Sequence, residues 1–363
     1  MKIELDAPNL GKLEKNYLNK TIDTGYVSTF GPFILEFEKK FARYLSVKNA
    51  VSTQSGTAAL HISLYELGVG LGDEVIVPDL TFAATVNPII YTGAKPVFVD
   101  VDIKTWNISP ENIERAVTKR TKAVIPVHLF GNPCDMDKLM KIAKRHNFFI
   151  IEDATESLGA KYKGKYTGTF GELGAFSFNG NKVITTGGGG MVAGIQEKRL
   201  GHIKFLVNQA RDETNEYYYP EIGFNYRMTN IEAALGLAQL QRLDGFLNKK
   251  KEFNAIYKEE LKKIDFIIFQ EEYEGAQSSF WSTCIFFEKK IDIIALQKKM
   301  KRKGIPARRI FMPVTESPPY KIYKNSDNKN SYRIYERSLC LPNSTLNSKD
   351  DIFYVCKTIK SLV

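Results

Sequence analysis

Cysteine is scarce in this chain, which has four among its 363 residues: Cys134, Cys284, Cys340 and Cys356. They are scattered, with no CxxC pair and no dense spacing. This excludes a disulfide scaffold and a zinc ribbon, and it suits a reducing, cytoplasmic setting. Histidine is equally rare and shows no ligand spacing, so no metal site is expected.

Long apolar runs are also lacking. The start of the chain, Met1–Asp6, has no apolar segment of the kind that a secretory signal contains. No stretch approaches the roughly 18 apolar residues that a membrane span needs. The sequence therefore predicts a soluble, cytoplasmic protein without a membrane partner.

Acidic residues are fewer than basic ones, 41 against 51, which leaves a net charge of +10. A nucleic-acid footprint would normally be a dense basic stripe. The longest basic runs here, Lys249–Lys251 and residues 298–303, resemble solvated helix faces. No nucleic-acid partner is expected, and the positive balance favours the approach of small polyanions instead.

Short β-branched runs without in-and-out alternation predict strands that are buried on both faces, as in parallel sheets. They lie at residues 75–77, 97–99, 123–125 and 148–151. Helical patterns lie between or beside them at residues 57–67, 110–118 and 136–146. This rhythm predicts an α/β layer fold.

A long amphipathic helix is predicted over Asn230–Leu247, with Thr229 or Asn230 as its N-cap. A charged helical stretch follows, and the rest of the chain has fewer strands and resembles a smaller α+β unit. We therefore divide the chain into a large domain, residues 1–248, and a small C-terminal domain, residues 249–363. The first roughly 20 residues are left free to pack elsewhere.

One lysine, Lys182, stands between a short aromatic strand and the glycine run Gly187–Gly190. One interpretation is a surface hairpin with a solvated lysine. The other is a reactive amine, because neighbours such as Phe176 and Phe178 favour the neutral form that imine formation requires. The glycines would let the backbone pass close to a bulky group. The segment by itself leaves both interpretations open.

Two further segments place polar groups where strands end. Asp153 follows the apolar run 148–151, at the edge where open α/β sheets bind ligands. It could instead cap a helix. Residues 52–60 pass from a strand through a turn of small residues into a helix, whose free N–H groups suit a phosphate. The alternative there is an N-cap by Ser55 or Thr57 without a ligand.

Together these three features are the parts that pyridoxal 5'-phosphate (PLP) requires. The lysine forms a Schiff base with the cofactor. The aspartate keeps the pyridine nitrogen protonated, so that the ring acts as an electron sink, and the helix terminus holds the phosphate.

The chain resembles the DegT/StrS family of PLP-dependent sugar-nucleotide aminotransferases almost from end to end. The resemblance rests on segments in the family's order: Gly25–Gly31, Gln54–Leu60, Asp79–Thr85, Pro126–Gly131, Glu152–Ala154, Ser177–Lys182 and Gly223–Met228. It implies the type I (aspartate aminotransferase) fold, a large mixed, mostly parallel sheet domain with a small C-terminal α+β domain. It also implies a homodimer with shared active sites.

The resemblance implies a role for each matched residue. Lys182 and Asp153 would be catalytic, as the Schiff-base and proton-transfer lysine and as the partner of the pyridinium nitrogen. Phe82 would stack on the ring, although it could be a plain core aromatic. The remaining cofactor contacts would be Gly56, Thr57 and Ser177 at the phosphate, Asn225 from the partner subunit, and Glu156 near the phenolic oxygen.

The resemblance further implies transfer of an amino group from L-glutamate to C4 of a nucleotide-linked 4-keto-6-deoxy sugar, giving an amino sugar for a surface glycan or glycoprotein. The segment around Lys182 looks most like enzymes acting on UDP-N-acetylhexosamine-type sugars, and next like GDP-perosamine synthases. Candidate substrate residues are Tyr26, Ser28 and Arg308, the last of which could also be a solvated arginine.

The chain departs from many relatives where Arg309 and Thr315 replace a proline and a histidine. This segment commonly borders the substrate, so the nucleotide and the sugar stay open. A dehydratase is disfavoured because its relatives replace the lysine with histidine. A regulatory protein that kept the fold without turnover is disfavoured by the intact set of Lys182, Asp153 and Thr57.

Overall fold

The structure is a computed structural model that describes residues 2–212, 214–215, 217–324 and 327–363. In this part of the chain a seven-stranded sheet has the order β1-β9-β8-β5-β4-β2-β3. Its strands are β1 (Asn49–Thr53), β2 (Glu74–Pro78), β3 (Lys95–Val99), β4 (Thr121–Val124), β5 (Phe149–Asp153), β8 (Leu173–Ser177) and β9 (Gly190–Gly194). Strand β9 runs antiparallel to both neighbours, and the other pairs are parallel. The predicted mixed, mostly parallel sheet is confirmed.

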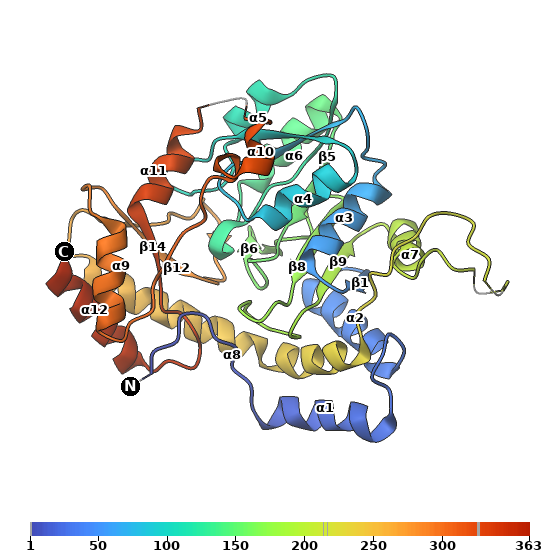
Figure 1. The fold of residues 1–363 in the computed structure, drawn as a ribbon, viewed down its shortest axis with the longest axis horizontal. Coiled ribbons are helices and arrows are strands. Elements are labelled where there is room, and N and C mark those ends of the chain that lie inside the picture. Colours follow the sequence, from blue (N-terminus) through green and yellow to red (C-terminus); the bar gives the residue numbers. More distant parts are fainter. Residues whose placement is uncertain (1, 213, 216, 325–326) are drawn as a thin grey trace.

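Helices cover both faces of this sheet (Figure 1). One face packs against α3 (Gly56–Glu66), α4 (Ala83–Tyr91) and α7 (Glu197–Leu206). The other packs against α2 (Pro32–Leu45), α5 (Pro110–Ala116), α6 (Met136–His146) and the first half of α8 (Asn230–Leu261). On β2, Val75 and Val77 face the first layer and Ile76 the second. Burial on both faces explains why these strands show continuous apolar runs.

Local signals set the ends of several helices. Helix α6 spans the predicted residues because the Asp135 carboxylate caps its first turn and Asn147 ends it in a left-handed conformation. Thr229 caps α8 in a reciprocal arrangement with Glu232. Helix α3 begins at Gly56, after its N-cap Ser55.

The C-terminal part of the chain forms a second sheet, which is antiparallel and four-stranded, with the order β10-β12-β14-β13. Its strands are β10 (Ile267–Phe269), β12 (Thr283–Phe287), β13 (Arg308–Arg309) and β14 (Ser338–Leu341). Its helices are α9 (Ile293–Arg302), α10 (Pro318–Lys321), α11 (Lys329–Arg337) and α12 (Lys349–Leu362). A short sheet of β6 (Lys161–Tyr162), β7 (Lys165–Tyr166) and β11 (Ala276–Gln277) joins the two parts of the chain. Single turns of 3₁₀ helix are η1 (Leu129–Gly131) and η2 (Val314–Glu316).

Helix α8 runs without interruption past residue 248 and changes its packing partners on the way. Phe246 belongs to the core beneath the large sheet, whereas Phe253 and Tyr257 belong to the core of the C-terminal part. The two-domain division at residue 248 remains a proposal, and this change of partners is what supports it.

The N-terminal segment lies against the C-terminal part, where Ile3 joins its core and Leu5 O accepts a hydrogen bond from Asn343 N–H at 2.7 Å. Helix α1 (Lys12–Thr24) comes next in the chain and packs alongside α8, as Figure 1 shows. Of the helices in the described ranges, none has both the length and the apolar character needed to cross a membrane.

Candidate active site

A cavity of about 460 Å³ opens at the ends of β1, β2, β5 and β8, beside the starts of α3 and α4. The predicted site residues among its lining are Gly56, Thr57, Phe82, Asp153, Glu156, Ser177, Lys182 and Arg308. The structure thus brings together eight residues that are spread over more than 250 positions of the chain. They meet because parallel strands present their carboxyl ends at one edge of the sheet.

Lys182 extends its side chain into this cavity rather than into solvent. The loop after β8 folds back, with the Lys182 N–H donating to Asn179 O at 3.0 Å. The side chain is only 14 % exposed, and its Nζ lies 3.6 Å from Oε1 of Glu156. The interpretation as a surface hairpin with a solvated lysine is therefore wrong.

Asp153 is the last residue of β5 and is buried beside the cavity. Thr85 Oγ1 donates to its Oδ2 at 2.7 Å, and Thr155 donates to its Oδ1 through both N–H and Oγ1, at 3.1 and 2.7 Å. These donors fix the orientation of the carboxylate, and lone pairs remain for one more donor from the cavity. The alternative role as a helix cap does not apply, because Asp153 caps none of the described helices.

The preceding residue, Glu152, faces the opposite side of β5. Its carboxylate accepts hydrogen bonds from the N–H groups of Gly168, Phe170 and Gly171 and contacts the buried His128. Because side chains alternate between the two faces of a strand, these two adjacent acidic residues have different roles. Glu152 holds a loop, and Asp153 faces the cavity.

The N-terminus of α3 forms a small cradle at the cavity wall. Ser55 caps the helix by accepting from Ala58 N–H at 3.1 Å. The N–H groups of the first helical residues, Gly56 and Thr57, have no acceptor within the helix. A Cβ on Gly56 would lie 2.8 Å from Cβ of Ser177, so only glycine lets these two segments approach. The cap by Ser55 thus leaves the N–H groups of Gly56 and Thr57 available to an anion.

Aromatic rings form much of the remaining wall. Phe82, 58 % exposed, precedes α4 and lies against Phe311, with the ring centroids 5.7 Å apart. Trp281 is buried, and its ring centroid lies 4.4 Å from Nζ of Lys182. Exposure on the cavity side excludes the alternative of Phe82 as a plain core aromatic.

Glu156 is buried beside Lys182, and its Oε2 accepts from Phe130 N–H at 2.9 Å. Burial raises the pKa of its carboxyl group, while the charge of Lys182 and the Phe130 N–H act in the opposite direction. The carboxyl group therefore keeps its proton to a higher pH than an exposed glutamate.

Arg308, on β13 of the C-terminal part, reaches the cavity from the other side. Its Nη1 lies 2.9 Å from Oδ2 of Asp6 in the N-terminal segment, in a partly exposed ion pair. The alternative of a free, solvated arginine does not hold, because the side chain has this fixed partner.

Three predicted residues lie outside the cavity of this chain. Asn225 is exposed in the segment that pairs with Asn208. Tyr26 and Ser28 are exposed before α2, and their carbonyl groups accept from Asn230 at the start of α8. Their roles remain predictions.

Sequence reasoning missed several lining residues, among them Thr85, Thr155, Asn181, Trp281 and Phe311. Thr85 and Thr155 lie close to predicted residues in sequence, so the hydroxyl groups near Asp153 were a usable signal. Trp281 carried no such signal, since its stretch has the pattern of an ordinary buried strand.

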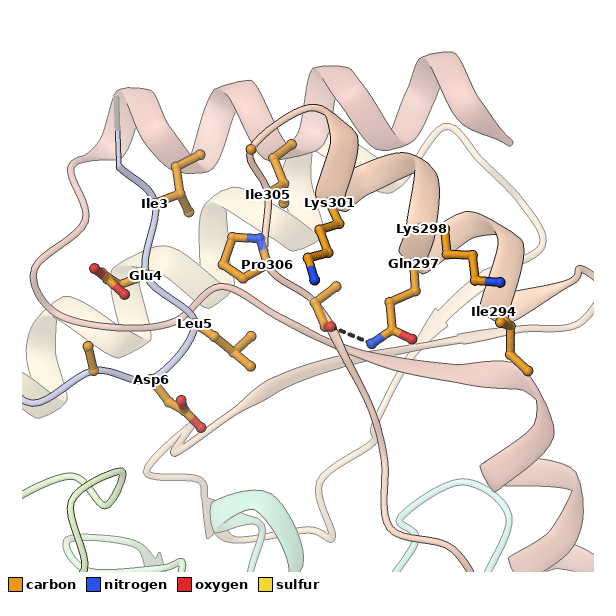
Figure 2. A pocket seen from close by; sticks show the side chains of 13 residues that line it. Ile3, Glu4, Leu5, Asp6, Ile294, Gln297, Lys298, Lys301, Ile305 and Pro306 are labelled. Carbon is orange, nitrogen blue, oxygen red and sulfur yellow. Dashed lines mark hydrogen bonds between the residues drawn. The ribbon is translucent and has the colours of Figure 1, made fainter.

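A larger hollow of about 780 Å³ lies between the N-terminal segment and α9 (Figure 2). Lys298 and Lys301 line one side, and Glu4 and Asp6 line the other. It contains neither Lys182 nor Asp153, so its greater volume does not make it the candidate site. In the described part of the chain no group of three or more His, Cys, Asp or Glu side chains is placed to hold a metal ion.

The fold and the cavity together define the class of protein. A mostly parallel sheet with a partly buried lysine in the loop after β8, and a helix N-terminus lining the same cavity, is the arrangement of a type I PLP-dependent transferase. The residues present also fit the cofactor, because Gly56 keeps open the space that a phosphate would need beside Ser177.

Comparison with known proteins narrows the class to one family. Residues 8–360 match the description "DegT/DnrJ/EryC1/StrS aminotransferase family". The GDP-perosamine synthase of Escherichia coli O157:H7 is 40 % identical over 98 % of this chain and 97 % of that protein. The GDP-perosamine synthase of Caulobacter vibrioides is 41 % identical over 88 % of this chain and 87 % of that protein.

Solved structures agree with this assignment. The sugar aminotransferase Spr1654 of Streptococcus pneumoniae, solved in its PMP and PLP forms, superposes with a TM-score of 0.95 at 27 % identity, covering 100 % of this chain and 98 % of that one. The chain belongs to the DegT/DnrJ/EryC1/StrS aminotransferase family and is a PLP-dependent sugar aminotransferase.

Proposed function

We propose that the protein transfers an amino group from L-glutamate to C4 of a nucleotide-linked 4-keto-6-deoxy sugar. The observation that carries this proposal is the meeting of Lys182, Asp153 and the free end of α3 around one cavity. A protein that kept the fold without turnover would have no need to keep this set of groups around one cavity.

Bound PLP supplies a carbonyl carbon that accepts amino groups and a protonated ring that withdraws electrons. The N–H groups of Gly56 and Thr57 and the Ser177 hydroxyl would hold the phosphate at the positive end of the α3 dipole. Asp153, oriented by Thr85 and Thr155, would keep the proton on the ring nitrogen. Phe82 lies at the cavity mouth, where its ring can stack on a flat group.

The Lys182 amine would hold the cofactor covalently until the amino donor takes its place. Its Nζ would then carry the proton that leaves the substrate carbon. Glu156, whose carboxyl pKa is raised by burial, would lie near the cofactor's phenolic oxygen. In the first half-reaction L-glutamate would give up its amino group and, with one water, leave as 2-oxoglutarate. In the second the sugar ketone would receive the nitrogen, and its oxygen would leave as water.

The identity of the nucleotide is the finer part of the proposal. The segment around Lys182 favours a UDP-N-acetylhexosamine-type sugar, as stated above. The relatives that are 40 % and 41 % identical are GDP-perosamine synthases, which favours a GDP-linked 4-keto-6-deoxy sugar. We place the GDP-linked sugar first, because identity over nearly the whole chain outweighs likeness in one segment.

Two subunits would share the sites in this proposal. Asn225 is exposed and lies outside the cavity of its own chain, which is where a residue that serves a partner's phosphate site would lie. Exposed Tyr26 and Ser28 would likewise reach a partner's substrate. Mixing Lys182→Ala and Asn225→Ala chains tests this arrangement, because only exchange of subunits that share sites can restore one intact site per dimer.

A panel of 4-keto-6-deoxy sugars linked to GDP, UDP and TDP tests the function directly. Purified protein, PLP and L-glutamate should yield 2-oxoglutarate with at least one of them, and mass spectrometry and NMR should find the new amine at C4. The matched control is Lys182→Ala. Absence of 2-oxoglutarate with every sugar, from protein that binds PLP, would contradict the proposal.

A further inference from the structure

Trp281, in the C-terminal part of the chain, makes one contact with the Lys182 side chain and one with the peptide bond before it. Its ring centroid lies 4.4 Å from the Lys182 Nζ, and its Nε1–H donates to the carbonyl group of Asn181 at 2.7 Å. One contact reaches the end of the lysine side chain, and the other reaches the peptide just before it. A buried indole N–H needs such a partner, so this hydrogen bond fixes the ring as well as the loop.

Glu156 contacts the same amine. Its Oε1 is 3.6 Å from Nζ, and its Oε2 accepts from Phe130 N–H. The ring of Phe130 stacks on Trp281, with the centroids 6.2 Å apart and the planes 12° from parallel. Trp281 and Glu156 are therefore linked through Phe130, and both lie beside the Lys182 amine.

A buried lysine donates a hydrogen bond to the backbone of Trp281. Lys250 of α8 is only 4 % exposed, and its Nζ donates to Trp281 O at 3.1 Å and to Asn343 O at 2.8 Å. The Asn343 side chain donates in turn to Phe280 O at 2.6 Å. A buried ammonium group is tolerated only with such acceptors. Hydrogen bonds therefore hold Trp281 both at its backbone carbonyl group and at its indole N–H.

We propose that Trp281 is a positioning residue that holds the Lys182 amine, against Glu156, in the orientation from which it anchors the cofactor and moves the proton. The assignment rests on the role of Lys182 in the proposed function. A cation lies well over an indole face, and a shift of about 1 Å in a reacting group can cost about a hundredfold in rate. The C-terminal part would thus affect the reaction through the Trp281 indole, which orients the Lys182 amine.

The test compares Trp281→Leu and Trp281→Phe with Phe287→Leu. Phe287 is a fully buried aromatic residue on β12 in the core of the C-terminal part, so its variant controls for loss of core packing. We expect kcat of Trp281→Leu to fall about tenfold to a hundredfold with a smaller change in KM. Trp281→Phe, which keeps a ring but loses the N–H donor, should lie between it and the wild type.

Two measurements separate positioning from a structural role. With glutamate deuterated at Cα, the isotope effect on the first half-reaction should increase in Trp281→Leu and stay unchanged in Phe287→Leu. Borohydride reduction followed by peptide mass spectrometry should show slower attachment of PLP to Lys182 in Trp281→Leu. Equal isotope effects and equal attachment rates in both variants would overturn the assignment.

Failure of the proposed function would be recognised separately. If borohydride does not attach PLP to Lys182 in the wild-type protein, the role of Lys182 is wrong, whatever the Trp281 variants do. If attachment is normal in the wild type, and Trp281→Leu equals Phe287→Leu in both its attachment rate and its isotope effect, only the inference about Trp281 fails.

Discussion

The two walls of the active-site cavity come from different parts of the chain and are built differently. The sheet wall consists of strand ends and helix starts, and it carries Gly56, Asp153, Ser177 and Lys182. The opposite wall comes from the C-terminal part and carries Trp281, Arg308 and Phe311. The sheet wall is fixed by the topology of parallel strands, whereas the C-terminal wall is fixed by side-chain contacts across a junction.

This difference suggests a division of work. In the proposed function, groups on the sheet wall bind the cofactor and perform the proton transfers. Groups on the C-terminal wall orient the lysine and contact the sugar substrate. Variants of the two walls should therefore fail in different ways, and the following predictions are ordered by their expected effect on turnover.

Lys182→Ala, on the sheet wall, should have the largest effect. Loss of the covalent anchor and proton carrier should reduce turnover by at least about 10³-fold, since removing a central catalytic group has effects of this size or larger. Both half-reactions should fail, as followed by 2-oxoglutarate release and by amination of the sugar. Lys298→Ala, at the exposed hollow beside α9, is the control and should keep wild-type rates. Comparable turnover in the two variants would contradict the assignment of the catalytic groups to the sheet wall.

Arg308→Gln, on the C-terminal wall, should affect only the second half-reaction. A charge-assisted hydrogen bond to an anionic diphosphate contributes about 1.5–3 kcal/mol, so KM for the nucleotide sugar should rise about 10- to 100-fold. The reaction with L-glutamate should change little, as measured in single turnovers. The matched control is Asp6→Asn, which removes the partner of Arg308 but keeps the guanidinium group. Equal slowing of both half-reactions by Arg308→Gln would contradict the division between the walls.

The sheet wall was predictable from sequence because its signals are local. The apolar run that ends in β5 locates Asp153 at a strand end, and the turn of small residues before α3 locates the cradle at Gly56. Alternation along β5 also explains why Asp153 faces the cavity while Glu152 holds a loop. Each of these inferences needs only a strand, its direction and the next few residues.

The C-terminal wall was not predictable in the same way. The hydrogen bond from Trp281 to Asn181 joins residues 100 positions apart, and the ion pair of Arg308 with Asp6 joins residues 302 apart. Nothing in the pattern around Trp281 distinguishes a residue that faces a cavity from one in a core. Contacts of this range depend on how two sheets pack, which periodicity does not encode.

Lys250→Met should have the smallest effect on turnover and a distinct effect on stability. Lys250 supports the C-terminal wall from beneath through its hydrogen bonds to Trp281 O and Asn343 O. Since the Trp281 ring keeps its bond to Asn181, kcat should fall only about threefold, which corresponds to less than about 1 kcal/mol. Burial lowers the pKa of the Lys250 ammonium from 10.5 to about 8.

The sign of the pH dependence follows from this lowered pKa. Between about pH 8 and 10.5 the folded protein has released a proton that the unfolded chain still holds, so the wild type gains stability as the pH rises. The gain amounts to about 3 kcal/mol over this interval, at 1.36 kcal/mol for each pKa unit. Below pH 8 the full penalty of the buried charge is present in the wild type.

Denaturant unfolding of both proteins across this pH range measures the effect. The difference in unfolding free energy, wild type minus Lys250→Met, should rise with pH, because titrations common to the two proteins cancel. A difference that stays flat from pH 7.5 to 10.5 would mean that Lys250 keeps an ordinary pKa and is not the buried support of the wall. The C-terminal wall would then be held without Lys250, by contacts such as those of Trp281 with Asn181 and of Arg308 with Asp6.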